Sequence, residues 1–236
     1  MPRTQLEGKH PRKLFDEYLT ESERTEVLES IYRLKEHWCP LFSGGYDKAF
    51  LLPAALYAKR RDAKEYSKLH LAARADMMTE FGWLYTKLVE TVSDRYGLPA
   101  VFSPNLNFPG FHIFFGPVDN RGLDSTQEYY LAAKERVHLD NFPDFIPEFE
   151  RQEHIESFIV PIQLPKNRDT NLWWWDSVDK ITKEPPNILT YSEGMLGHWH
   201  GQYPHAIGEV VLEEGEARIS LQFHVCIKPD RVILFW

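Results

Sequence analysis

The longest regular pattern in the chain is Ala217–Ile227, which reads ARISLQFHVCI. Apolar and polar side chains alternate along it, as in a β-strand whose two faces meet different surroundings. The apolar face carries Ala217, Ile219, Leu221, Phe223, Val225 and Ile227. The other face carries Arg218, Ser220, Gln222, His224 and Cys226. That polar face either meets water or lines the mouth of a barrel. We favour the barrel, because residues 221–227 are rather apolar for an edge strand.

The sequence after Pro99 contains further short apolar runs, separated by Pro, Gly, Asn and Asp. Runs of this kind predict strands. Besides 217–227, the expected strands are Ala100–Ser103, Phe111–Phe115, Ser157–Leu164, Asn171–Trp175, Asn187–Tyr191, Met195–Trp199, Ala206–Leu212 and Arg231–Phe235. Many short strands with turn residues between them favour a sandwich or a jelly roll. We therefore predict a mainly β fold, a cupin-like double-stranded β-helix supported by N-terminal helices.

The first 97 residues carry helical signals instead. Thr20-Glu21-Ser22-Glu23 predicts a helix start with Thr20 or Ser22 as the N-cap. A second long helix is expected from near Asp62 until Gly97 and Pro99 stop it. Its apolar stripe is typical of a packing face and consists of Met77, Phe81, Leu84, Leu88 and Val92. Residues 1–97 are therefore expected to support the β-rich residues 98–236 within one domain, 1–236.

Composition and charge narrow the classes of function. The chain has 236 residues, of which 43% are hydrophobic and 26% charged, so a normal globular core can form. Its formal net charge of −8 argues against binding to nucleic-acid phosphates. Cys39 and Cys226 form no Cys-x-x-Cys pair, and no apolar run reaches membrane-spanning length. The expectation is a soluble cytoplasmic protein with no nucleic-acid or membrane partner; no particular oligomeric state is predicted.

Three polar segments follow one another in an order that suits a metal site: His138-Leu139-Asp140, then Pro204-His205, then Arg218-Ile219-Ser220. Residues i and i+2 of an extended segment point the same way, so His138 and Asp140 could reach one ion. Two imidazoles and one carboxylate are the ligand set of a mononuclear non-haem Fe(II) site that keeps coordination positions open.

The third ligand has to come from a distant strand, and the candidates are His198, His200, His205 and His224. We prefer His205 because it follows the turn residue Pro204 and begins an apolar strand. It also precedes Arg218 by 13 residues, a spacing that suits a hairpin returning past the metal. In the alternative, His198 and His200, which share a face, bind zinc together with a carboxylate.

The order His-x-Asp, then His, then Arg-x-Ser near the C-terminus resembles the 2-oxoglutarate/Fe(II)-dependent oxygenases. The resemblance covers roughly residues 100–236. Ser157–Leu164 and Leu172–Trp175 are similar to the paired strands that follow the His-x-Asp motif in this family. Gly194-Met195-Leu196 is similar to the approach to its second histidine, here His205.

The resemblance implies a role for each residue of the pattern. His138, Asp140 and His205 would bind Fe(II). Arg218 and Ser220 would hold the 5-carboxylate of the cosubstrate 2-oxoglutarate, since a guanidinium pairs with a carboxylate through two parallel hydrogen bonds. Molecular oxygen would occupy the remaining position on the metal, and the cosubstrate would be converted to succinate and carbon dioxide.

The expected activity is hydroxylation of a small molecule, such as an amino acid or a natural-product intermediate, because the compact chain has no added recognition module. Radical halogenases of this superfamily replace the metal carboxylate with a small residue. Asp140 therefore favours hydroxylation, or desaturation, over halogenation. The alternatives are a peptide or protein hydroxylase of the same superfamily and a non-catalytic jelly-roll binding protein. Two features stay open: His112 as pocket or core residue, and Trp173–Trp175 as pocket wall or barrel packing.

Overall fold

The computed structural model describes residues 10–41, 48–55, 63–119, 137–140, 155–166, 170–208 and 210–236. Its helical elements are α1 (Glu21–Arg33), η2 (Lys35–His37), α3 (Ala63–Tyr96) and η5 (Val178–Lys180). Its strands are β1 (Arg12–Phe15), β2 (Cys39–Pro40), β3 (Ala49–Leu52), β4 (Ala100–Phe102), β5 (Gly110–Phe115), β6 (Val118–Asp119), β7 (Ile155–Gln163), β8 (Asn171–Trp174), β9 (Asn187–Thr190), β10 (Leu196–His200), β11 (His205–Ile207), β12 (Val211–Leu212), β13 (Ala217–Ile227) and β14 (Val232–Phe235).

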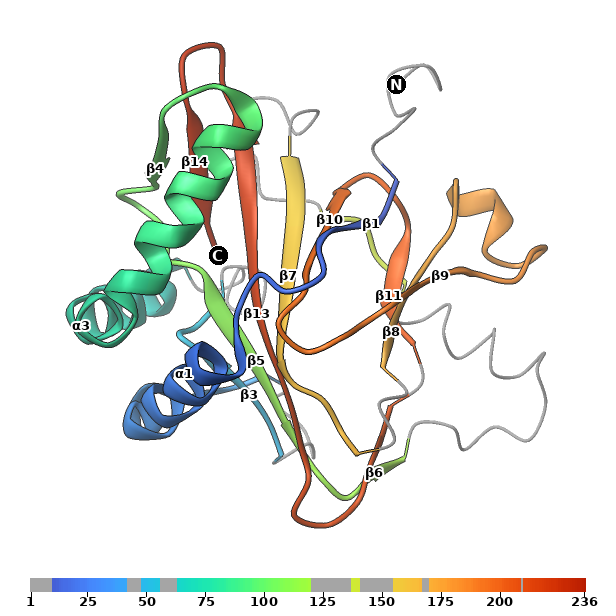
Figure 1. Cartoon of the computed structure of the whole chain (residues 1–236), viewed down its shortest axis with the longest axis horizontal. Coiled ribbons are helices and arrows are strands. Elements are labelled where there is room, and N and C mark those ends of the chain that lie inside the picture. Colours follow the sequence, from blue (N-terminus) through green and yellow to red (C-terminus); the bar gives the residue numbers. More distant parts are fainter. Residues whose placement is uncertain are drawn as a thin grey trace.

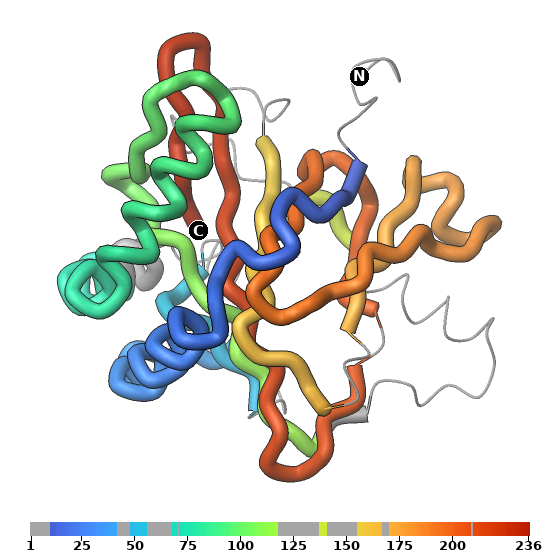
Figure 2. The backbone as a smooth tube through the Cα atoms, in the orientation of Figure 1, coloured from blue at the N-terminus to red at the C-terminus, as the bar shows by residue number. Residues whose placement is uncertain are grey.

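A large sheet runs through the middle of the molecule in the order β1-β10-β7-β13-β5-β3-β2, with β14 beside β13 and β4 beside β14. All its pairings are antiparallel except β14 with β4. The long strand β13 pairs with β7 along one edge, and with β5 and then β14 along the other. The tube in Figure 2 shows this red strand between the yellow β7 and the green β5.

A small antiparallel sheet, in the order β11-β8-β9, lies on the side of the large sheet opposite the helices. Figure 1 shows α1 and α3 on one side and β8, β9 and β11 on the other. A further pair, β12 with β6, extends from the end of this arrangement. The predicted class is therefore confirmed: the fold is a jelly roll of antiparallel strands with helices packed on one sheet.

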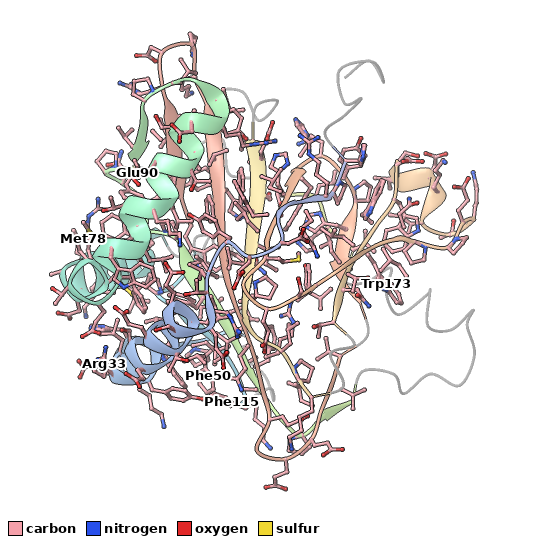
Figure 3. The ribbon with its side chains drawn as sticks, in the orientation of Figure 1. Arg33, Phe50, Met78, Glu90, Phe115 and Trp173 are labelled. Carbon is pink, nitrogen blue, oxygen red and sulfur yellow. The ribbon has the colours of Figure 1, made fainter. Side chains whose placement is uncertain are left out.

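The apolar face of β13 packs against the helices. Its buried side chains join the α3 stripe in one core cluster, whose members include Ile219, Leu221, Phe223, Val225, Met77, Phe81, Leu84, Leu88 and Val92. The predicted stripe is thus a packing face. Phe50 of β3 and Phe115 of β5 lie side by side at the edge of this layer, with ring centroids 6.3 Å apart (Figure 3). Because β13 uses its apolar face here, its polar face turns to the interior between the two sheets.

The helices begin and end where the sequence places the signals. Thr20 is the N-cap of α1 and forms a complete capping box with Glu23. Helix α3 begins at Ala63 and bends at Phe81, whose backbone angles are not helical. Gly97 follows it with a φ of 63°, a conformation that glycine adopts without strain. Met78 and Glu90 lie on the side of α3 turned away from the sheet (Figure 3). None of the described helices has the length and apolarity needed to cross a membrane.

Two features differ from the sequence prediction. The first 97 residues contribute strands as well as helices: β1 pairs with β10, and β3 pairs with β5. The predicted strand 206–212 is two short strands, β11 in the small sheet and β12 paired with β6. Gly208 lies at the break, and a Cβ there would come within 2.4 Å of the Trp173 indole. This close approach lets the chain leave one sheet for the other.

Candidate metal centre

The His138-Leu139-Asp140 segment is held against β11 by its backbone. His138 and His205 exchange two backbone hydrogen bonds, both 3.0 Å long, and form an isolated antiparallel bridge. The Asp140 amide donates to the Gly201 carbonyl at 2.9 Å. These contacts place the His-x-Asp segment directly opposite the strand that carries the third candidate ligand.

His138, Asp140 and His205 come together in space, with their ligand atoms all within 4.8 Å of one another. Asp140 Oδ1 lies 3.7 Å from His138 Nε2 and 3.5 Å from His205 Nε2. Two atoms each bound to one ion at about 2.1 Å are at most about 4.2 Å apart, when they lie on opposite sides of it. Both distances fall short of this limit. Asp140 Oδ1 could therefore share one ion with either histidine, as a facial set of ligands requires.

His205 is fixed by a second hydrogen bond. Its Nδ1 lies 2.8 Å from the Tyr203 carbonyl oxygen, which can only accept, so Nδ1 carries the hydrogen. The other ring nitrogen, Nε2, lies toward Asp140 Oδ1. Metal-binding histidines are usually oriented by a bond of this type.

The charges of the three candidate ligands favour the binding of a cation between them. Burial raises the pKa of Asp140, but the imidazoles of His205, His224 and His138 lower it more, and the net shift is downward. Burial lowers the pKa of His205, whereas Asp140 and the Tyr203 carbonyl raise it, and the net shift is upward. An ionised carboxylate thus attracts positive charge to the space between two imidazoles, and this donor set fits Fe(II).

Behind Asp140 lies a second layer that the sequence prediction missed. Ser157 of β7 donates a hydrogen bond from its hydroxyl to Asp140 Oδ2. The same hydroxyl lies 3.0 Å from Nδ1 of His224, its cross-strand partner on β13. Burial lowers the pKa of His224 to about 4. His224, a candidate third ligand, therefore stands one serine away from the carboxylate and outside the group of three.

Arg218 and Ser220 lie on the polar face of β13 and are each 1% exposed. Within the described part of the chain, Nε, Nη1 and Nη2 of Arg218, Oγ of Ser220 and the hydroxyl of Tyr191 have no hydrogen-bond partner. The guanidinium lies between two rings, 5.6 Å from that of Phe114 and 5.9 Å from that of Tyr191. Leaving a buried guanidinium unpaired costs on the order of 3–5 kcal/mol. The site therefore suits an anion, and the fork of donors fits a carboxylate.

His112 links this anion site to the three candidate ligands. It is the cross-strand neighbour of Ser220. Burial lowers the pKa of His112 to about 3, and the charges of Arg218, His138 and His224 lower it as well. His112 also packs edge-on against the Trp236 ring. It therefore lies in the polar interior between the sheets, within electrostatic reach of both ends of the candidate site.

The alternative zinc site is not formed, because His198 and His200 contact different partners. His198 Nε2 pairs with Glu156 on β7, and the Arg95 guanidinium lies 3.3 Å from His198 Nδ1. Glu156 also accepts a hydrogen bond from Tyr96 at the end of α3, so this cluster is on the helix side of the sheet. His200 Nδ1 instead accepts from the Gln202 amide at 3.2 Å. In the described ranges, only His138, Asp140 and His205 form a group of three metal-ligating side chains.

The three consecutive tryptophans take two roles. Trp173 (Figure 3) and Trp175 are buried with Ile181, and Val137 packs against this cluster. They therefore support the residue that precedes His138. Trp174 is half-buried and stacks on His10 with ring centroids 6.0 Å apart. Packing accounts for Trp173 and Trp175.

Comparison with known proteins relates the fold to one group of enzymes. No family model matches the sequence, and no curated protein is detectably similar to it. Among solved structures, an N-substituted L-amino acid dioxygenase from Burkholderia ambifaria AMMD superposes with a TM-score of 0.59 at 13% identity, covering 93% of this chain and 84% of that one. The same dioxygenase in complex with alpha-KG gives a TM-score of 0.53 at 13% identity, with the same coverage.

A third structure is the non-heme alpha-ketoglutarate-dependent epimerase SnoN from nogalamycin biosynthesis. It has a TM-score of 0.51 at 14% identity and covers 96% of this chain and 83% of that one. The similarity thus extends over nearly the whole chain. The protein has the jelly-roll fold of the 2-oxoglutarate/Fe(II)-dependent oxygenases.

Proposed function

We propose that this protein is an Fe(II)- and 2-oxoglutarate-dependent oxygenase, formed by one domain over residues 1–236, that hydroxylates a small molecule. One observation carries the proposal: a two-histidine, one-carboxylate cluster shares the sheet interior with a buried arginine that has no partner among the described residues. The first feature fits Fe(II), and the second fits the carboxylate of a 2-oxoacid. Neither requirement is met by an ordinary hydrophobic core.

In this proposal, His138 and His205 bind the metal through Nε2, and Asp140 binds it through Oδ1. The Tyr203 carbonyl orients His205, and Ser157 orients Asp140. With 2-oxoglutarate and molecular oxygen, Fe(II) supplies an oxidant strong enough for an unactivated C–H bond, while the cosubstrate becomes succinate and carbon dioxide. The protein's part is to bind, orient and exclude water.

Arg218 and Ser220 bind the distal carboxylate of 2-oxoglutarate. The guanidinium offers paired donors, and Ser220 adds a hydroxyl. The Tyr191 hydroxyl, which has no partner in the described part of the chain, can donate a further hydrogen bond. The Phe114 and Tyr191 rings exclude water from this contact and strengthen it. A carboxylate here satisfies buried donors that have no partner among the described residues.

A small substrate is supported by two of the enzymes whose structures superpose on this chain. One is named for an N-substituted L-amino acid, and the other comes from natural-product biosynthesis. Asp140 retains the carboxylate in the candidate metal cluster, which favours oxygen transfer over halogenation. We therefore place free and N-substituted amino acids first among the substrates to be tested, followed by natural-product intermediates.

The test is made in two steps. The protein is first loaded with Fe(II) without oxygen and titrated with 2-oxoglutarate, following the visible charge-transfer band of the chelate. Oxygen is then admitted with a panel of candidate substrates, and succinate and oxidised product are quantified. We expect tight binding of both components and succinate release stimulated by at least one substrate. Failure to bind Fe(II) and 2-oxoglutarate together would overturn the proposal and leave a non-catalytic jelly roll.

A further inference from the structure

Ser157 occupies an unusual place for a single hydroxyl in a long apolar strand. It is 1% exposed, and its neighbours Phe158 and Val160 belong to the helix-side core. Its own side chain points the other way and contacts both the Asp140 carboxylate and the His224 imidazole. A serine buried between a candidate metal ligand and a histidine suggests a function for the pair.

The hydrogen atoms of this chain can be assigned from the groups involved. An ionised carboxylate only accepts, so the Ser157 hydroxyl must donate its single hydrogen to Asp140 Oδ2. The Ser157 oxygen is then an acceptor, and His224 Nδ1, 3.0 Å away, must carry a hydrogen to bond to it. The direction of donation is therefore His224 to Ser157 to Asp140.

His224 is held firmly behind the serine. It is 7% exposed, and its ring stacks on Trp236 with an interplanar angle of 12° and lies 5.6 Å from the Phe235 ring. Ser157 and His224 are also cross-strand partners in the middle of the large sheet. Both donors are thus fixed by the most extensively paired strands of the molecule, and they orient the carboxylate rigidly.

The two oxygens of Asp140 therefore have different roles. Oδ1 faces His138 and His205, at 3.7 and 3.5 Å, whereas Oδ2 is engaged by Ser157. A free carboxylate can bind a metal through one oxygen or through both. Binding through both would occupy one of the positions that a three-ligand site must leave for 2-oxoglutarate and oxygen.

We propose that Ser157, backed by His224, is a positioning residue that restricts Asp140 to one metal-bound oxygen and so keeps three coordination positions open. This inference rests on the proposed function, because it assigns Ser157 a role at the same metal centre. The hydroxyl acts through Asp140 and touches neither metal nor substrate. It also lowers the entropy lost on metal binding, because Asp140 is held in its binding conformation beforehand.

The experiment compares Ser157→Ala with Ser157→Thr, which keeps a hydroxyl, and with Ser30→Ala as a matched control. Ser30 is also buried and hydrogen-bonded to a charged side chain, Arg33, but lies on α1. Fe(II) affinity is measured by anaerobic titration. We expect Ser157→Ala to lose roughly 10- to 100-fold in affinity, and Ser157→Thr to recover most of the loss. The Ser30→Ala control should bind Fe(II) with the same affinity as the wild type.

Two further measurements do not depend on turnover. The visible absorption of the Co(II)-loaded protein reports the coordination number, and we expect it to change in Ser157→Ala and not in Ser30→Ala. In the metal-free protein, the ¹⁵N chemical shifts of His224 report its tautomer. We expect a protonated Nδ1 in the wild type, and a changed Nδ1 shift in Ser157→Ala because its acceptor is lost. Circular dichroism confirms that each variant folds.

The outcomes separate this inference from the proposed function. If the wild type binds Fe(II), but Ser157→Ala binds it as tightly and with an unchanged Co(II) spectrum, the inference is wrong and the proposed function stands. A wild-type His224 without a hydrogen on Nδ1 would also refute it, whatever the metal does. If the wild type binds no metal ion, the proposed function fails, and the inference fails with it.

Discussion

At the scale of single residues, the buried guanidinium of Arg218 most clearly requires a ligand with the opposite charge. Its three guanidinium nitrogens are buried and have no partner within the described residues. Burial lowers the pKa of Arg218, but guanidinium groups stay protonated in proteins, so a positive charge remains to be neutralised. A carboxylate placed between Phe114 and Tyr191 would do so in a dry environment.

Arg218→Lys should therefore weaken 2-oxoglutarate binding and leave metal binding nearly unchanged. Lysine keeps the charge but loses the paired donors, a loss of roughly 1.5–3 kcal/mol, or about ten- to a hundredfold in affinity. The measurement is titration of the Fe(II)-loaded variant with 2-oxoglutarate. Arg231→Lys, the same exchange at an exposed position, is the control and should bind like the wild type. If Arg218→Lys binds 2-oxoglutarate as tightly as Arg231→Lys and the wild type, another cation holds the cosubstrate.

His205→Ala should abolish Fe(II) binding or leave it very weak, because a site with three protein ligands tolerates the loss of one poorly. His200→Ala is the matched control, since His200 is equally buried but lies outside the group of three. Iron content after anaerobic reconstitution distinguishes the two variants, with circular dichroism to confirm folding. Loss of iron in His200→Ala together with its retention in His205→Ala would show that the third ligand is misassigned.

At the scale of elements, the long strand β13 organises both halves of the molecule. Its apolar side chains join the helix-side core, and its polar side chains supply Arg218, Ser220 and His224 to the interior. The alternation predicted this strand with its bounds, Ala217–Ile227. Ser157 could not be predicted in the same way, because one serine in an apolar strand has no signal of its own. Its importance follows from its register with His224, which joins strands far apart in the sequence.

The start of α1 offers a test at the same scale. The Thr20 side chain accepts a hydrogen bond from the Glu23 amide, and Glu23 in turn accepts from the Thr20 amide and from Lys87 of α3. Thr20→Ala should lower the free energy of unfolding by about 1 kcal/mol. Chemical denaturation measures the change. Ser22→Ala, at the exposed neighbouring candidate for the N-cap, should stay within about 0.5 kcal/mol of the wild type. A larger loss of unfolding free energy in Ser22→Ala than in Thr20→Ala would show that Ser22 is the N-cap.

At the scale of the whole molecule, ligand binding should be visible as added stability. A ligand present at 100 times its dissociation constant stabilises the folded state by about 2.7 kcal/mol, which raises the melting temperature of a chain of this size by roughly 5–10 °C. We expect this shift with Mn(II) and 2-oxoglutarate together, in the absence of turnover. Mn(II) is used because it accepts the same oxygen and nitrogen ligands. Arg218→Lys should lose about half or more of the increment due to 2-oxoglutarate at the same ligand concentration.

The change of periodicity near Pro99 was sufficient to predict the fold class, because long amphipathic patterns are strong local signals. The N-terminal strands escaped prediction for a physical reason. Strands β1 and β3 have four residues each, too few to display a pattern, and they are strands only because distant partners complete them. Likewise, Gly208 divides the predicted strand 206–212 through its contact with Trp173, which nothing local reveals. The roles of His138, Asp140, His205, Arg218 and Ser220 stay predictions that the experiments above test.

The pairing of β1 with β10 also has a consequence for the order of events during synthesis. Arg12 lies opposite His198, so β1, the first strand among the described residues, pairs with a strand that is made much later. At about 5–20 residues per second, a ribosome needs roughly 10–40 s to make the intervening segment. Throughout that time, β1 has no sheet to join, and Arg218 and Ser220 do not yet exist. The nascent chain can form α1 and α3 early, but the large sheet cannot be completed until β10 and β13 have been made. A ribosome stalled before β13 would therefore hold a chain with its helices made and its interior open, a natural substrate for chaperones.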